Sequence, residues 1–207
     1  MWDIFPLVSD IDHEKLYRLA ESQAGFFTTR QAAEAGMERS TLSHHARPNG
    51  RYRRIRRGLY RLRDFPSVPH EHVMAAWLPL REAGAVVSHE TALELHDLSD
   101  VIADEVHLSL SRAERGQRPR ARVRLHTLNH PPGKAEVHNV AGLPVTNPER
   151  TIVDVLEAGG QPEQVEMAIS QALGRGLTTP RRLIAAASGR SGRVREFIQR
   201  AAGEASP

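Results

Sequence analysis

A short arginine-rich segment, residues 51–62, limits most strongly what the N-terminal part of this chain can fold into. Its sequence is RYRRIRRGLYRL, in which Ile55, Leu59 and Tyr60 interrupt a row of arginines. The Arg57-Gly58 pair is a plausible tight turn between two strands. The segment therefore predicts a two-stranded ribbon with one apolar face and an abundance of cationic side chains.

The residues before this ribbon predict three helices. The first begins at a cap formed by Asp10 or Asp12 and ends before Gly25. The second covers Thr29–Ala35, and the third, which is polar, covers Glu38–Ala46. A short helix, a glycine turn and a polar third helix form the layout of a helix-turn-helix. A ribbon directly after the third helix is the wing of such a domain.

The charge of the chain is concentrated in the same region. Residues 30–63 contain ten arginines and only two acidic residues, Glu34 and Glu38, a net of +8, whereas the whole chain has a net charge of +3. Because arginine forms flat, bidentate bonds to phosphate and guanine, a dense arginine block favours a nucleic-acid partner. A proteome that uses arginine in place of lysine would explain why most cationic residues of the chain are arginines, but it would not explain why they cluster in this segment.

We therefore expect the third helix to enter the major groove of DNA and the ribbon to hold the backbone or reach the minor groove. The candidate DNA-binding residues are Thr29, Arg30, Arg39, Ser40, Thr41, Ser43, His44, Arg51, Arg53, Arg54, Arg56, Arg57 and Arg61. The alternative is that the same helices and ribbon bind another protein, with the arginines solvated.

A proline-containing stretch, Asp64–Pro69, separates the basic segment from the rest of the chain. It predicts two domains, a winged helix-turn-helix at 1–65 and a mixed α/β domain at 66–207, and thus the α+β class. The expected strands of the second domain are 106–110, 123–128, 136–140 and 143–145, and the expected helices are 71–83, 90–97, 148–157, 162–173, 179–187 and 193–202.

Several kinds of chemistry find no support in the sequence. The chain has no cysteine, which excludes disulfides and thiolate sites and fits a cytoplasmic location. Neither Lys15 nor Lys134 follows an acidic residue by two positions, so the carboxylate-lysine pattern of metal-dependent nucleases is missing. No glycine-rich phosphate loop, nucleophile elbow or membrane-length apolar run occurs. We therefore predict a protein that is not an enzyme, has no cofactor and does not bind a membrane.

Eleven histidines raise the question of a metal site. The nearest pairs are His70 with His72 and His89 with His96, and the second pair could converge on one helical face. No third ligand accompanies either pair along the sequence, so we predict no metal site and a hydrogen-bonding role for His89 at the start of a helix.

The segment Pro148–Asp154 has two interpretations. Glu149, Arg150 and Asp154 could form a polar cluster that binds a partner. The alternative, which the sequence favours, is a helix capped by Thr146 or Asn147 whose apolar stripe faces the core.

Four stretches of the sequence resemble the AbiEi family, the antitoxins of type IV toxin–antitoxin systems, which are often described simply as transcriptional regulators. They are GFFTTRQA at 25–32, RRIRRGLY at 53–60, VVSHETALELHDL at 86–98 and GLPVTNPERTIVD at 142–154. The resemblance spans roughly residues 12–160, and the combination of stretches is more specific than any one of them.

The resemblance implies a winged helix-turn-helix joined to a mixed α/β C-terminal domain. Members of the family repress their own operon by binding inverted repeats in double-stranded DNA, and their C-terminal domain counteracts a nucleotidyltransferase-like toxin. Two alternatives remain open: a stand-alone regulator whose C-terminal domain binds a ligand or a partner and, least supported, a DNA-processing enzyme.

Overall fold

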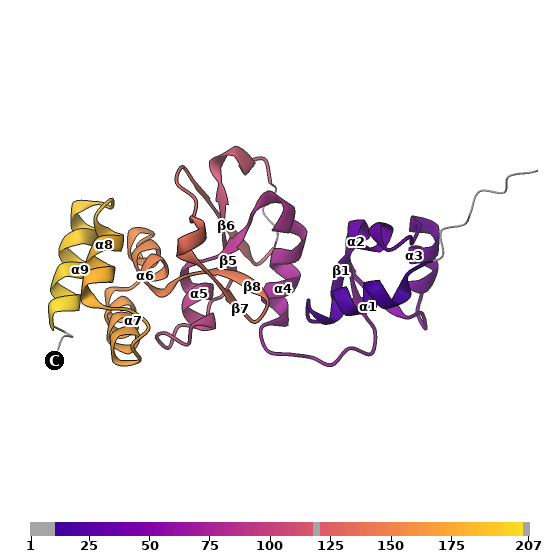
Figure 1. The fold of residues 1–207 in the computed structure, drawn as a ribbon, viewed down its shortest axis with the longest axis horizontal. Coiled ribbons are helices and arrows are strands. Elements are labelled where there is room, and N and C mark those ends of the chain that lie inside the picture. The colour runs from indigo at the N-terminus through magenta and orange to yellow at the C-terminus, as the bar shows by residue number, and fades with distance from the viewer. Residues whose placement is uncertain (1–10, 118–120, 205–207) are drawn as a thin grey trace, which may run out of the picture. The chain divides into compact units, whose positions relative to one another are not determined.

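The computed structural model describes residues 11–117 and 121–204. The chain divides into two compact units, residues 1–79 and 80–207 (Figure 1). The N-terminal unit includes the whole of the predicted first domain and extends beyond it to a further helix, α4 (Glu71–Trp77).

The N-terminal unit contains the three predicted helices and the predicted ribbon. The helices are α1 (His13–Glu21), α2 (Thr29–Glu34) and α3 (Arg39–His45), and the strands are β1 (Phe26–Thr28), β2 (Tyr52–Arg56) and β3 (Leu59–Leu62). The sheet is antiparallel with the order β1-β3-β2, so β3 is its central strand. Strand β1 was not predicted, because its three residues are too few to show an alternating pattern.

Local capping interactions explain where the first two helices begin. The side chain of Asp12 accepts a hydrogen bond of 2.8 Å from the backbone N–H of Lys15. At α2, the Thr28 hydroxyl accepts from the N–H of Gln31, and the Gln31 side chain accepts from the N–H of Thr28, which is the predicted capping box.

The core of this unit joins the helices to the ribbon. Phe27 is fully buried. Its ring meets that of Tyr52 edge-on, with centroids 5.0 Å apart, and stacks on that of Tyr60, with centroids 5.8 Å apart. Leu16 of α1 and Leu42 of α3 belong to the same apolar cluster. The apolar face that the ribbon sequence predicted is therefore the face that packs against the helices.

The C-terminal unit is built on a mixed five-stranded sheet with the order β6-β5-β4-β8-β7. Its strands are β4 (Val86–Val87), β5 (Val106–Ser111), β6 (Val123–Leu128), β7 (Val137–Val140) and β8 (Leu143–Thr146). The pairs β5–β6 and β4–β8 are parallel, and β4–β5 and β7–β8 are antiparallel. With the N-terminal sheet and helices, this sheet confirms the predicted α+β class.

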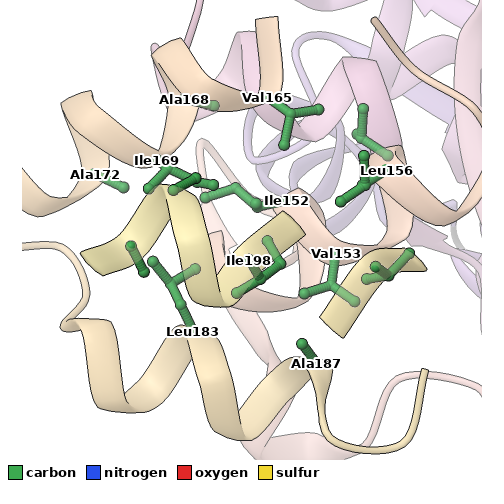
Figure 2. Packing of buried hydrophobic residues seen from close by; sticks show 14 of the residues in the cluster. Ile152, Val153, Leu156, Val165, Ala168, Ile169, Ala172, Leu183, Ala187 and Ile198 are labelled. Carbon is green, nitrogen blue, oxygen red and sulfur yellow. The ribbon is translucent and has the colours of Figure 1, made fainter. Parts of the chain in front are cut away.

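The described residues of this unit also form five α-helices, namely α5 (His89–Leu95), α6 (Pro148–Glu157), α7 (Pro162–Gly174), α8 (Pro180–Ala187) and α9 (Gly192–Glu204). Helices α6 to α9 pack around a common apolar core to which each contributes, for example Ile152, Ile169, Leu183 and Ile198 (Figure 2). No helix in the described ranges is both long enough and apolar enough to cross a membrane.

The polar residues of α6 lie inside this unit. Arg150 is 8% exposed and Asp154 is 3% exposed. The Arg150 guanidinium donates to both carboxylate oxygens of Asp154, at 3.0 Å and 2.8 Å, and to Glu136. Asn147, rather than Thr146, caps the helix with its side chain. The structure therefore supports the interpretation of this segment as a core helix.

Candidate nucleic-acid interface

Helix α3 has one buried position and an exposed polar face. Leu42 is 1% exposed and anchors the helix in the core. Arg39, Ser40, Ser43 and His44 are exposed. Because positions separated by four residues share a helix face, these four side chains form one polar surface. Thr41, the remaining candidate on this helix, is half-buried.

Two sets of contacts hold the ribbon (β2 and β3) beside the C-terminal end of α3. The ring of His45 packs against that of Tyr52, with centroids 5.7 Å apart. Arg63 donates from Nη2 to the carbonyl oxygens of Arg47 and Tyr52, at 2.9 Å and 3.1 Å. Burial, and then the neighbouring side chains of His13, His44 and Arg51, lower the pKa of His45. A neutral imidazole therefore forms this junction at neutral pH.

The ribbon exposes the arginines of β2 and of the turn. Arg53, Arg54 and Arg57 are exposed. A register shift between Arg54 and Arg56 indicates a bulge at Ile55, which is 38% exposed. The turn depends on Gly58, whose φ of +80° is in the left-handed region.

A backbone contact links this turn to the start of α2. The N–H of Thr29 donates to the carbonyl of Gly58 at 3.1 Å. Thr29 itself is half-buried. The next residue, Arg30, is exposed and forms an ion pair of 2.9 Å with Glu34 on the same helix.

Two arginines of the predicted set are engaged within the protein. Arg61 is only 4% exposed, and its Nη2 donates to Glu71 at 2.7 Å and to the carbonyl of Pro66 at 2.9 Å. Arg56 is half-buried and donates to the carbonyl of Ala75. Every residue of β3 is buried, so Arg61 is not exposed to a DNA partner.

Six exposed arginines of the interface, unlike Arg61, form no ion pair within the described residues. They are Arg39, Arg47, Arg51, Arg53, Arg54 and Arg57. Within residues 11–117 and 121–204, no ion pair joins any of the six to a carboxylate. Arg47 was not among the predicted residues, although it belongs to the same basic block of the sequence. Unpaired surface guanidinium groups remain available to an anionic partner.

The histidines are arranged differently from the pairs suggested by the sequence. The Nε2 atom of His96 lies 2.7 Å from the carbonyl of Thr146, so its contact is with the backbone of β8. His89 instead lies close to His107 and His126, which belong to strands β5 and β6. The sequence showed no sign of this group, because its members come from three separate elements.

The helices, the capping box and the ribbon together form the winged helix-turn-helix architecture. Residues 14–63 match the protein-family model described as "Transcriptional regulator, AbiEi antitoxin". The predicted resemblance to this family is therefore confirmed over this segment. It supports a regulatory role for the protein.

The fold of the chain is similar to that in the crystal structure of the RV2827C protein from Mycobacterium tuberculosis. The two have a TM-score of 0.58 and 16% sequence identity, over 91% of this chain and 75% of that chain. No curated protein sequence matches the chain. At this identity, the similarity concerns the fold alone.

Proposed function

We propose that this protein is a sequence-specific DNA-binding repressor. The observation that carries the proposal is the set of exposed, unpaired arginines on the ribbon, next to the exposed polar face of α3. In a winged helix-turn-helix these are the two elements that contact DNA, and here they are also the elements that concentrate positive charge.

In this mechanism α3 lies in the major groove and reads base edges. Arg39 has the donor geometry for the O6 and N7 atoms of guanine, and Ser40, Ser43 and His44 offer shorter polar side chains to neighbouring bases. The half-buried Thr29 and Thr41 contribute only through their exposed atoms.

The ribbon holds the phosphates on either side of this helix. Its exposed arginines, Arg51, Arg53, Arg54 and Arg57, contribute affinity that does not depend on sequence. Arg30 adds a cation at the start of α2. Arg56 supports the ribbon from inside the protein, and Arg61 is not part of the proposed contact surface.

The resemblance to AbiEi antitoxins supports two finer parts of the proposal. The protein represses its own operon by binding inverted repeats in the promoter, and its C-terminal domain, at 66–207, counteracts a nucleotidyltransferase-like toxin in the cytoplasm. Both actions consist of binding, so no catalytic residue is assigned. A stand-alone regulator whose C-terminal domain binds a ligand would have the same DNA interface.

A gel-shift titration of the protein on its own upstream DNA tests the proposal. A scrambled duplex serves as competitor, and the titration is repeated over a series of salt concentrations. If about six phosphates are neutralised, a plot of the logarithm of the affinity against the logarithm of the salt concentration has a slope of about −5.

A charge-matched pair of variants separates the interface from net charge. Arg54→Ala is expected to weaken binding, whereas Arg181→Ala, which removes an exposed arginine of α8, is expected to leave it unchanged. Equal binding of the upstream and scrambled duplexes would contradict a sequence-specific repressor. It would favour a ribbon that docks a protein or that serves as a non-specific anchor.

A further inference from the structure

Three histidines from separate elements meet in the C-terminal unit, which contains none of the residues assigned to DNA. His89 is the first residue of α5, His107 lies on β5 and His126 lies on β6. Strands β5 and β6 are parallel neighbours (Figure 1). His126 is in register with Ser109, two residues after His107, so both histidines are on the same face of the sheet.

The ring nitrogens of this histidine cluster are close enough to share a ligand. One nitrogen from each ring lies within 4.8 Å of the other two. His126 Nε2 and His107 Nδ1 are 3.3 Å apart, but this nitrogen of His107 also faces Glu90, so His107 would have to offer a metal the lone pair of its other nitrogen, Nε2. The rings of His89 and His126 are stacked, with centroids 3.5 Å apart and planes 11° from parallel.

Outer partners hold two of the rings, as they do around metal-binding histidines. The Nδ1 atom of His107 lies 2.6 Å from a carboxylate oxygen of Glu90. The Nδ1 atom of His89 lies 2.9 Å from the hydroxyl of Ser88, which in turn accepts a hydrogen bond of 2.8 Å from Ser109. A histidine that donates from one nitrogen to such a partner presents the lone pair of its other nitrogen to a metal.

Burial and close neighbours shift the pKa values of two of the three imidazoles. Burial, and then the neighbouring His126, lower the pKa of His89 to about 3. Burial, and then the neighbouring His107, lower the pKa of His126 to about 4. Both rings are therefore neutral at neutral pH and release no proton on coordination.

The backbone adds a sign of strain at the same place. His89 has a φ of +54°, in the left-handed region that residues with a side chain rarely adopt. Such conformations persist where the surrounding structure holds them, and they are concentrated at functional sites.

We propose that His89, His107 and His126 bind one divalent transition-metal ion, with Zn²⁺ the first candidate. Imidazole nitrogens suit ions of this intermediate softness, and three histidines with a fourth position open to water or to another ligand form a known zinc arrangement. Glu90 and Ser88 are the outer partners that orient two of the rings.

Metal binding requires a defined movement of the rings. Two nitrogens bound to one tetrahedral zinc, at about 2.0–2.1 Å each, lie about 3.3 Å apart, which is closer than the outer limit of 4.8 Å in this cluster. An ion lies in the plane of each ring that binds it, so the stacked His89 and His126 must turn out of their stack. This rotation predicts a change in the imidazole signals of the nuclear magnetic resonance spectrum on zinc addition.

The bound ion would connect an edge strand to the rest of the unit. Strand β6 is at the edge of the sheet and pairs only with β5. A metal bound by histidines of α5, β5 and β6 would cross-link this edge strand to the neighbouring strand and helix. Because a ligand stabilises the state that binds it, zinc is expected to raise the melting temperature of the protein.

The test is a zinc titration of the full chain without an affinity tag, with a chromophoric chelator as competitor and elemental analysis of the dialysed protein. His126→Gln is the main variant, because His126 is only half-buried and a glutamine is tolerated more easily there than at His107. His138→Gln, at an exposed position of β7, is the matched control.

We expect one zinc per chain in the wild type and in His138→Gln, with a raised melting temperature in both. His126→Gln should lose stoichiometric binding and the thermal shift, while its circular dichroism stays that of the wild type. Glu90→Gln should bind about 10–100-fold more weakly, because it loses the outer carboxylate.

Two results would overturn the proposal. One is the absence of stoichiometric zinc binding by the wild type, which would leave the cluster as a stack of neutral, hydrogen-bonded imidazoles. The other is equal zinc binding by the wild type and His126→Gln, which would place any metal elsewhere on the chain.

Discussion

The ribbon of the N-terminal unit and helix α6 of the C-terminal unit use the same residue type in opposite ways. Arg53, Arg54 and Arg57 of the ribbon are exposed and unpaired among the described residues, whereas Arg150 of α6 is buried against Asp154 and Glu136. A second arginine, Arg190, also reaches Asp154, at 2.5 Å. The comparison shows that the setting of an arginine, rather than its presence, decides whether it is available to a partner.

The physical reason is the free energy of solvation. A guanidinium removed from water loses its hydration and is stable only when anions and carbonyl groups replace it. Arg150 meets this condition with two carboxylates and the carbonyl of His130. The ribbon arginines keep their water, so they can exchange it for phosphate at little cost.

The largest expected effect is that of removing the acid at the centre of the α6 network. Asp154→Asn leaves Arg150 and Arg190 without their shared carboxylate in a buried site. We expect a loss of about 3–5 kcal/mol in the free energy of unfolding, measured by urea denaturation, with Glu163→Gln at an exposed position of α7 as control. A loss similar to that of the control would mean that the network contributes little to stability.

A smaller effect, on binding rather than on stability, is expected at α3. Arg39→Ala should weaken binding to the specific duplex by about 1–3 kcal/mol and relax the preference at one base position. Its free energy of unfolding should stay within about 0.5 kcal/mol of the wild type, because Arg39 is exposed. Fluorescence anisotropy on a set of single-base operator variants measures both the loss and the position. A variant that binds every duplex as the wild type does would remove Arg39 from the interface.

The next prediction separates two adjacent ribbon arginines. Arg57→Ala should weaken binding to all duplexes about equally and reduce the magnitude of the salt slope by about 1, because Arg57 is exposed and unpaired in the described structure. Arg56→Ala should instead lower stability, because it removes the hydrogen bond to Ala75. Salt-dependent anisotropy and urea denaturation of both variants provide the comparison. If the two effects are exchanged, the assignment of these side chains to the surface and the interior is incorrect.

The smallest expected effect is a pH dependence within the C-terminal unit. Burial lowers the pKa of His96 from its ordinary value of 6.5. As the pH falls, the unfolded chain protonates this ring while the folded protein still keeps it neutral. The contribution of His96 to the free energy of unfolding is therefore present above pH 6.5 and is lost as the pH falls toward the folded-state pKa. Urea denaturation at a series of pH values should show a shallower acid loss for His96→Gln than for the wild type. Identical profiles would show that His96 does not contribute.

Much of the local structure could be predicted from the sequence because its causes lie within a few residues. The capping box at Thr28 and Gln31, the turn at Gly58 and the proline at the start of α6 depend on neighbours in the chain. The elements of the proposed interface, α3 and the ribbon, were predicted in the same way. Their contacts with DNA remain a proposal.

The burial of particular polar residues could not be predicted in this way. Arg61 belongs to the same basic block as the exposed arginines, and its burial depends on contacts with Phe26 of β1 and with Glu71 of α4. The change from α-helix to 3₁₀-helix over Leu78–Ala83, by contrast, follows from Pro79, which the sequence shows directly.

The sequence by itself determined the order of the α-helices and of the longer strands, the basic character of the ribbon and the apolar stripes of the helices, because these depend on residue type and on short spacings. Only the tertiary structure decided which arginines remain in water, which carboxylates pair with Arg150 and which three histidines meet. These outcomes depend on strand register and on contacts between residues far apart in the chain, and a pattern that repeats every two or four residues carries no information about them.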